Sequence, residues 1–331
     1  MKWITLFLLC SLPVVANTLP SEKRKNGPLI QKALSPVQGY LQESSAVFYD
    51  NKTYKNFIYG TVVSSDGLVL TKASELEEVE DYVIRIGTKK YRSIKVVATD
   101  VSWDVALVKV EAEGLLPVDL TGNSEIAHGT WVLSNGSSER MFRRPRPGII
   151  SANKREIPGG SPVVLGVQFQ FKDGEIKVNE IIEESGAEKA GVQKGDILVR
   201  VDGKDIVDDK SFIDYLRAKV PGDLIKLGIL RGSVELDLEV ELMARHKLFG
   251  GPQSQNDQMS GEFSERRESF PMVLQHETML SAQSVGGPLF TFEGRFLGMN
   301  IAAANRVESF AIPVEELCKV LDELKISAGI Q

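Results

Sequence analysis

Residues 281–300 of the chain read SAQSVGGPLFTFEGRFLGMN. Gly286, Gly287 and Pro288 form a turn signal, and the apolar runs on either side of Gly294 are predicted to be short strands. Val285, which comes directly before the turn, offers no nucleophilic atom. The stretch therefore predicts a tight turn followed by two strands. Val285, at the start of this turn, cannot act as a nucleophile.

Short strands fill much of the remaining chain. Runs of β-branched and aromatic residues alternate with turn signals such as SSDG at 64–67, TGN at 121–123 and NGS at 135–137. Many short strands at this spacing predict an all-β barrel or sandwich. Near residue 160 the pattern changes, because helical patterns over Ser185–Ala190 and Ser211–Lys219 are mixed with the strands.

Composition limits the class of protein. The chain has 331 residues and a formal net charge of −6. At about 100–200 residues per domain, this length predicts two or three domains. An acidic chain lacks the basic surface that nucleic acid needs, so nucleic acid is not an expected partner. The three histidines have no Cys or His at ligand spacing, so the sequence predicts no metal site and no cofactor.

The first residues carry a leader pattern. Lys2 precedes an apolar run over Ile4–Leu9, and Ala16 is a small residue at a suitable cleavage point. The run is too short to span a bilayer, so we expect export without a stable membrane anchor. Cys10 would leave with the leader and Cys318 would remain alone, so the exported fold would have no internal disulfide.

Four segments, in order, resemble the HtrA/Deg family of exported serine proteases. They are GTVVSSDGLVLTKASEL (60–76), TDVSWDVALVKV (99–110), GTWVLSNGSSERMFRRPRPGIISA (129–152) and LQHETMLSAQSVGGPLFTFEGRFLGMN (274–300), followed by FAIPVEEL (310–317). Each segment alone is a weak signal, and their shared order makes the resemblance specific. The resemblance implies a mainly β, trypsin-like fold of two packed six-stranded antiparallel barrels with the active site between them.

The resemblance also shows which catalytic positions are substituted. It places the family's histidine at Ser74, its aspartate at Asp104 and its nucleophile at Val285, with Gln283 replacing a glycine of the oxyanion turn. Such a protease needs a hydroxyl nucleophile and an imidazole base. Loss of either lowers turnover by about 10⁶ in a well-studied triad, so proteolysis by this mechanism should be negligible. Ser284 and His276 form a conceivable substitute pair.

The middle of the chain resembles a PDZ domain, through SGAEKAGVQKGDILVRVDGKDI (185–206) above all. Such domains bind an extended C-terminal tail as an added strand. The resemblance implies that the tail carboxylate meets backbone N–H groups of the loop before the edge strand, and that a helix forms the far wall of the groove. The candidate binding residues are Leu165, Gly166, Val167, Phe169, Phe212 and Leu216. The last two are equally compatible with ordinary core positions.

The PDZ-like part precedes the nucleophile segment, although in HtrA proteases it follows the protease domain. We therefore expect an α+β PDZ domain inserted into the second barrel. The predicted division is a signal peptide (1–16), an arm (17–43), the trypsin-like domain's first barrel and start of the second (44–158), the PDZ domain (159–243), a linker (244–270), and the remaining second barrel with a closing helix (271–331). The arm is expected to be partly disordered.

Three functions fit these patterns. The first is an inactive, exported binding protein of the bacterial periplasm that takes peptide or protein C-termini through its PDZ domain, in protein quality control or as regulator of a partner protease. Unfolded proteins are further candidate partners, and a homo-oligomer is a candidate state. The second is an active serine-type endopeptidase with a rearranged site. The third is a structural scaffold whose PDZ groove is closed by its own linker.

Overall fold

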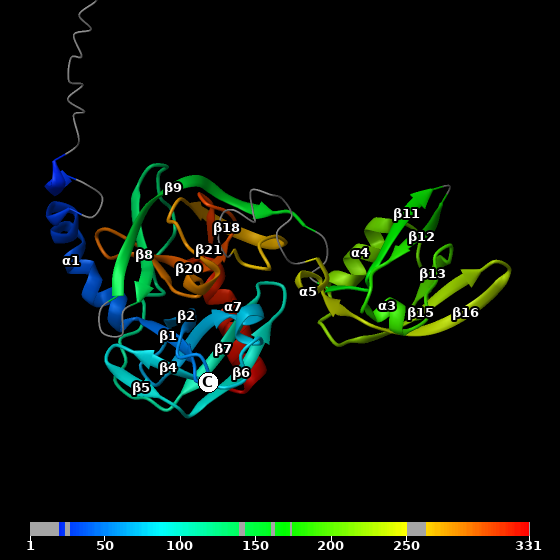
Figure 1. Ribbon diagram of the computed structural model, residues 1–331, viewed down its shortest axis with the longest axis horizontal. Helices are drawn as coiled ribbons and strands as arrows, with labels where there is room; N and C mark the ends of the chain where they lie inside the picture. The colour runs from blue at the N-terminus through cyan, green and yellow to red at the C-terminus, as the bar shows by residue number, and fades with distance from the viewer. Residues whose placement is uncertain are drawn as a thin grey trace, which may run out of the picture.

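A computed structural model describes most of the chain (Figure 1). The described residues are 20–23, 27–138, 143–159, 163–172, 174–249 and 263–330. The expected leader over residues 1–16 lies outside them. The chain forms two packed β-structures and a separate smaller unit, which lies to the right in Figure 1 and which we call the middle unit (residues 163–244). The mainly β fold class expected from the sequence is confirmed.

The first β-structure is a seven-stranded antiparallel sheet in the order β5-β4-β1-β2-β3-β7-β6. Its strands are β1 (Ser45–Asp50), β2 (Asn56–Val62), β3 (Leu68–Lys72), β4 (Tyr82–Ile86), β5 (Lys89–Tyr91), β6 (Ile94–Asp100) and β7 (Val105–Val110). Six strands were expected, and the additional one is the three-residue β5, which pairs with the edge of β4. Strand β3, in the interior of the sheet, is buried along its whole length, because its two faces pack into two different cores.

The second β-structure is a closed barrel in the order β18-β21-β20-β19-β8-β9. Its strands are β8 (Trp131–Ser138), β9 (Arg143–Ile157), β18 (Phe270–His276), β19 (Pro288–Thr291), β20 (Phe296–Ala303) and β21 (Ser309–Pro313). Strands β8 and β9 come before the middle unit in the chain and the other four come after it. The barrel therefore closes only when the chain returns from the middle unit, by pairing of β18 with β9.

Two helices cover the barrels. Helix α7 (Val314–Ala328) confirms the closing helix expected over about 313–326, and it buries Leu317, Leu321 and Leu324 in the largest core. Helix α1 (Pro28–Glu43) was not expected, because it falls in the polar arm. Its Leu34, Val37 and Leu41 are nevertheless buried in the same core, which orders this part of the arm.

Helix α1 also accommodates a proline in its interior. Pro36 lacks the N–H that would bond to the Lys32 carbonyl one turn earlier. The hydroxyl of Ser35 donates to that carbonyl oxygen at 2.9 Å instead. The substitute hydrogen bond explains why a turn signal at residue 36 does not end the helix.

The middle unit is a sheet in the order β11-β12-β13-β15-β16, with β14 added on β13. Its strands are β11 (Val167–Lys172), β12 (Glu175–Ile181), β13 (Ile197–Val201), β14 (Lys204–Asp205), β15 (Leu224–Arg231) and β16 (Val234–Glu241). The short strands β10 (Val163–Val164) and β17 (Met243–Ala244) pair with each other where the chain enters and leaves the unit. The two ends of the unit therefore lie side by side.

Both helices expected in the middle unit are present. Helix α3 (Gly186–Lys189) begins after Ser185, whose side chain accepts from the Glu188 amide. Helix α4 (Asp209–Arg217) begins with a capping box between Asp208 and Ser211. The remaining short helices are η1 (Ser21–Lys23), α2 (Ala73–Leu76), α5 (Arg245–Phe249) and η2 (Ala282–Ser284).

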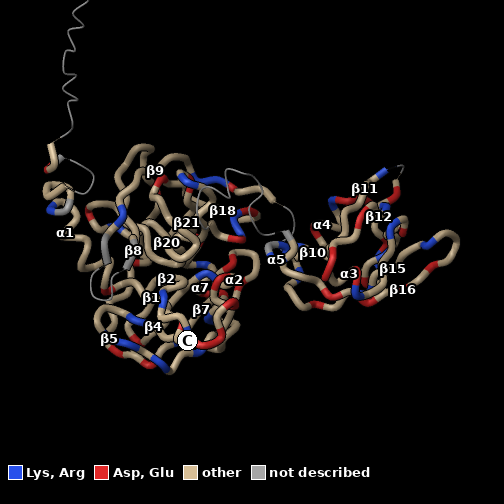
Figure 2. The backbone as a smooth tube through the Cα atoms, in the orientation of Figure 1, with Lys and Arg blue, Asp and Glu red and all other residues tan. Residues whose placement is uncertain are grey.

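Charged residues of both signs are interspersed over the β-structures and the middle unit (Figure 2). None of the described helices is long and apolar enough to cross a membrane. Within the same residues, no group of His, Cys, Asp and Glu side chains is arranged to hold a metal ion.

Candidate functional site

Ser74 and Asp104 lie in direct contact. Asp104 stands in the turn between β6 and β7, and Ser74 stands in the first turn of α2, just after β3. The Ser74 amide donates to Asp104 Oδ1 at 2.8 Å, and the Ser74 hydroxyl lies 2.9 Å from Asp104 Oδ2. Both side chains are almost fully buried. The structure therefore brings together two of the three positions that the resemblance assigns to catalysis.

Lys72 supplies the positive charge at this site. Its side chain is fully buried, and its Nζ lies 3.2 Å from Asp104 Oδ2 and 3.1 Å from Glu75 Oε2. The same ammonium donates to the carbonyl oxygen of Arg266 at 2.7 Å. An ammonium has three donors, and three acceptors surround this one. Lys72 is therefore a satisfied structural cation that holds two carboxylates.

The two carboxylates differ in protonation. Burial favours the neutral form of Asp104, but attraction to Lys72 and Arg266 outweighs burial and lowers the pKa of this carboxyl. Burial raises the pKa of Glu75 to about 7, and repulsion from Asp104 adds to the effect. The single Ser74 hydroxyl proton faces both Glu75 Oε2, at 2.7 Å, and Asp104. One proton cannot serve two carboxylates, which favours a protonated Glu75.

Asp104 also has an unusual backbone. Its φ is +59°, in the left-handed region that Asp and Asn tolerate better than other non-glycine residues. Its carbonyl accepts from the Ala73 amide at 2.9 Å. Backbone and side chain together fix this turn against the start of α2.

Arg266 reaches the site from a distant part of the chain. Its guanidinium donates to the carbonyl oxygens of Val101, Ser102 and Ser269. The side chain is buried, and burial lowers its pKa. The fork of N–H donors thus ties the segment before β18 to the turn that carries Asp104.

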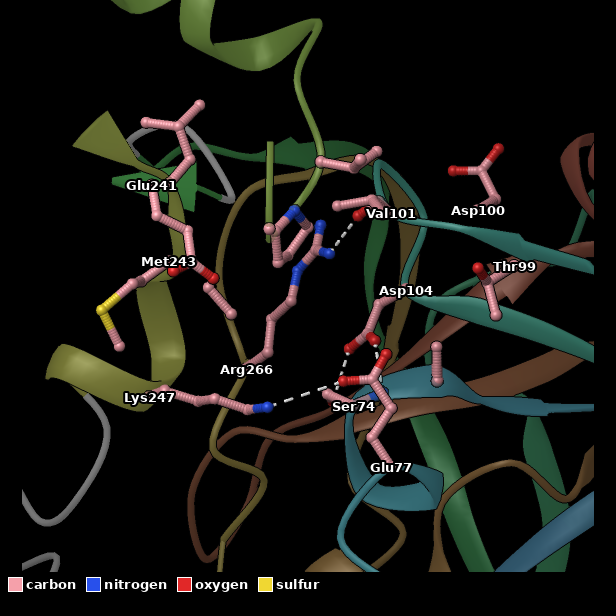
Figure 3. A pocket seen from close by; sticks show the side chains of 16 residues that line it. Ser74, Glu77, Thr99, Asp100, Val101, Asp104, Glu241, Met243, Lys247 and Arg266 are labelled. Carbon is pink, nitrogen blue, oxygen red and sulfur yellow. Dashed lines mark hydrogen bonds and ion pairs between the residues drawn. The ribbon is translucent and has the colours of Figure 1, made fainter. Parts of the chain in front are cut away.

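A cavity of about 470 Å³ opens beside these residues (Figure 3). Helix α2 and the turn between β6 and β7 contribute one wall with Ser74, Glu77 and Asp104, and the middle unit contributes another with Glu241 and Met243. In the close-up, Arg266 and Lys247 extend between these two walls. The complete lining is Ala73, Ser74, Glu77, Thr99, Asp100, Val101, Asp104, Val220, Pro221, Gly222, Glu241, Leu242, Met243, Ala244, Lys247 and Arg266.

Val285 is fully buried in an apolar cluster that also contains Ala73 and Ala303. Its carbonyl accepts from the Tyr59 amide at 2.9 Å. The following Gly286 has φ +84°, and a Cβ there would lie 2.0 Å from the Tyr59 carbonyl oxygen. The turn predicted from the Gly-Gly-Pro signal is therefore tightly packed against β2, and the side chain before it is a core residue.

Ser284 and His276 make separate contacts. The Ser284 hydroxyl lies 3.1 Å from the Ser281 hydroxyl, whereas His276 Nδ1 accepts from the Thr278 amide at 3.3 Å. Burial lowers the pKa of the fully buried His276 to about 4. The hydrogen bonds recorded for the described residues include none between Ser284 and His276, so the substitute pair is not assembled.

The loop expected to bind a carboxylate lies at the edge of the middle unit. Gly166 has φ +87°, and its carbonyl accepts from the Ile182 amide at 2.9 Å. Bonded positions alternate along an antiparallel ladder, so the N–H and C=O of Val167 point to the opposite side. Strand β11 is the end strand of the sheet, and that side faces away from β12. Leu165 is buried beneath the loop.

Phe169 connects β11 to α4. Its ring lies 6.2 Å from the ring of Phe212, in an edge-to-face arrangement. Phe212 and Leu216 are almost fully buried in the core of the unit, whereas Val167 and Phe169 are half-buried. The contact of Phe169 with Phe212 thus joins β11 to α4, whereas Phe212 and Leu216 themselves are core residues.

Three residues of the Asp104 site were missed in the sequence. They are Lys72, Glu75 and Arg266, and the contact from Lys72 to Arg266 joins residues that are 194 positions apart. A charged pair at Lys72 and Glu75, inside an otherwise apolar run, is a signal that could have been noticed. Nothing local marks Arg266 among the charged residues of the polar stretch.

Comparison with known proteins identifies two domain types. A trypsin-like peptidase domain model matches residues 59–177, and a PDZ domain model matches residues 163–242. A probable periplasmic serine endoprotease DegP-like protein of Ectopseudomonas mendocina is 23% identical over 286 residues, which is 60% of this chain and 60% of that protein. A protein of the same name from Pseudomonas fulva is 34% identical over 104 residues, 31% of this chain and 22% of its own length.

The chain therefore spans about 60% or less of the length of these relatives. Among solved structures, the MamO protease domain of Magnetospirillum magneticum in its apo form is similar, with 13% identity and a TM-score of 0.44. That similarity covers 85% of this chain and 96% of the other.

Proposed function

We propose that this chain, which is HtrA-like and combines a trypsin-like peptidase domain with a PDZ domain, is a binding protein. It binds protein C-termini and does not cleave them. The main support for the absence of proteolysis is the closed network of hydrogen bonds and ion pairs around Asp104. An aspartate that orients a catalytic imidazole must leave an oxygen for it. Here Ser74 and Lys72 occupy both oxygens of Asp104.

The burial of Val285 supports the same proposal. A nucleophile needs a hydroxyl or thiol beside a base, in reach of a substrate carbonyl. Val285 has neither group and is fully buried among apolar side chains. The rival hypothesis of a rearranged endopeptidase would need Ser284 and His276 to meet, and each is bonded elsewhere.

The edge of the middle unit supports the binding half. A peptide added to β11 would find the outward N–H and C=O of Val167, with half-buried Phe169 beside it. The left-handed backbone at Gly166 bends the loop in front of this edge, where N–H groups of Leu165, Gly166 and Val167 would meet a carboxylate. The partner class is therefore a flexible chain with a free C-terminal carboxylate, on an unfolded protein or on a partner protease.

Tail binding is tested with fluorescent decapeptides of random apolar C-termini, each made with a free and with an amidated terminus. We expect binding of the free-acid pool and at least about a ten-fold weaker affinity for the amidated pool, since a charged hydrogen bond is lost. Equal affinity for both pools would contradict carboxylate recognition. No binding by either pool would favour the scaffold hypothesis.

Inactivity is tested on the same preparation with unfolded casein and a fluorophosphonate probe. An active trypsin-like protease serves as the positive control. We expect neither cleavage nor covalent label. A label that maps to Ser284 or to another serine would overturn the proposal and establish an enzyme with a relocated nucleophile.

The leader pattern and the names of the relatives support the proposal that this protein is exported to the periplasm. The DegP-like relatives are named periplasmic, and the expected cleavage after Ala16 would release this chain there. Detection of the intact mature N-terminus at Asn17 in a periplasmic extract would support export. Retention of Met1 in the purified native protein would contradict it.

A further inference from the structure

The segment Phe263–Ser269, which we call the strap, contacts both the second barrel and the first sheet before the chain enters β18 at Phe270. At one end, the Ser264 amide donates to the Ala303 carbonyl at 3.1 Å, and the Ala303 amide donates to the Ser264 hydroxyl at 3.1 Å. Ser264 is almost fully buried although it is polar and lies in a polar stretch. The strap therefore holds the end of β20 through one backbone and one side-chain hydrogen bond of Ser264.

Two residues after Ser264, Arg266 holds the strap against the turn between β6 and β7. Its guanidinium binds the carbonyl oxygens of Val101 and Ser102, and its own carbonyl accepts from the buried Lys72 ammonium at 2.7 Å. The ring of Phe270 lies 4.9 Å from the guanidinium and covers it. The same Lys72 holds Asp104, so the strap and the Asp104 site share one cation.

The strap is also tied to the exit of the middle unit. Arg245 Nε, in the first turn of α5, lies 3.1 Å from Glu268 Oε1. Lys247 Nζ lies 3.7 Å from Oε2 of Glu77 at the end of α2. These contacts are partly exposed and individually weak. Arg266 of the strap and Lys247 of α5 nevertheless both line the cavity that Ser74 also lines.

We propose that the strap is an internal peptide ligand that occupies the junction of the two β-structures beside Asp104, with Arg266 as its anchor. The backbone groups of Ala303 and the buried ammonium of Lys72 are the receptor groups. A peptide of another protein can reach them only after the strap has left. The inference rests on the described contacts and is independent of tail binding by the middle unit.

The first test is hydrogen exchange of the unmodified protein, read by mass spectrometry with fragmentation to single amides. We expect the Ser264 and Ala303 amides to exchange at least about ten-fold more slowly than the same residues in unstructured peptides. The reference for Ser264 is the free octapeptide FSERRESF. Exchange of Ser264 at the rate of that octapeptide would overturn the proposal.

The second test compares two neighbouring arginines. Arg266→Ala removes the anchor, whereas Arg267→Ala removes an equal charge from the residue whose guanidinium lies over Phe263. We expect Arg266→Ala to speed exchange at Ser264, Ala303 and Ser74 by about ten-fold or more, and Arg267→Ala to leave these rates within about two-fold. Equal exchange rates at these amides in both variants would refute the role of Arg266 as the anchor.

Loss of folding is separated from loss of the strap by a distant amide. Leu107 in β7 is fully buried and should exchange equally in all folded variants. If Arg266→Ala does not fold, Arg266→Lys decides the question, because lysine keeps the charge without the planar fork that reaches several carbonyls. We expect Arg266→Lys to speed hydrogen exchange at the Ser264 amide while the Leu107 amide stays protected. Unchanged protection of Ser264 would contradict the role of Arg266 as the anchor of the strap.

Discussion

The Lys72 ammonium lies 3.2 Å from Asp104 Oδ2, and both side chains are buried. In a working triad the corresponding carboxylate faces an imidazole that gains and loses a proton. Here it faces a cation that is held by two carboxylates and a carbonyl oxygen. The cation beside Asp104 therefore has its own fixed partners, and this arrangement suits a structural role better than orientation of a catalytic imidazole.

Removal of the Lys72 ammonium should lower the free energy of unfolding. Lys72→Met leaves Asp104 and Glu75 buried without their shared partner, and breaking a buried pair on one side typically costs about 3–5 kcal/mol. Urea unfolding of the variant should show that loss. Lys109→Met is the matched control, because Lys109 pairs with Asp66 at an exposed site, and should cost less than about 1 kcal/mol. Similar losses in both variants would contradict a buried network.

Glu75 should make stability depend on pH. Its folded pKa is raised to about 7 from 4.5, so the folded protein keeps a proton that the unfolded chain has already lost between these values. The contribution of Glu75 to stability is therefore largest below about pH 4.5 and falls as pH rises to about 7. The total change is on the order of 3 kcal/mol.

The Glu75→Gln variant isolates this effect, since glutamine does not titrate. The stability of the unmodified protein relative to the variant should fall between pH 5 and pH 8 in urea titrations. A pH-independent difference for Glu75→Gln would indicate that Glu75 is ionised throughout.

Phe169 should contribute to tail binding more than its neighbour on the same strand. Phe169 is half-buried against Phe212, whereas Phe171 is exposed. Phe169→Ala is expected to weaken binding of the free-acid peptides by about 10-fold or more, because an aromatic wall of the groove is lost. Phe171→Ala should stay within about three-fold in the same fluorescence titration. The reverse order would place the peptide elsewhere on the unit.

Local patterns predicted most of the fold. Alternating runs and turn signals predicted the strands, and the turn at Gly286 forms as its residue type dictates. Helix α1 was missed because Pro36 and the polar setting outweighed Leu34, Val37 and Leu41. Burial of those three side chains depends on the barrels, and a local window contains no information about them.

The Asp104 site was predicted only in part. Ser74 and Asp104 were placed together through the resemblance, and they are in contact. Arg266 could not be placed, because its partners Val101 and Ser102 lie about 165 positions away and are backbone carbonyls, which carry no sequence signature. The strap has the composition of a linker, although its buried Ser264 and Arg266 make it part of the fold.

The surroundings of Val285 provide the last prediction. If the position before Gly286 belongs to an apolar core, a hydroxyl there finds no partner and costs about 1–3 kcal/mol. Val285→Ser should therefore be less stable than Val285→Ala, which creates a cavity of similar size without a polar group. Urea unfolding of the two variants measures the difference directly. A serine variant as stable as the alanine variant would show a polar environment suited to a nucleophile, and it would reopen the case for an enzyme at this site.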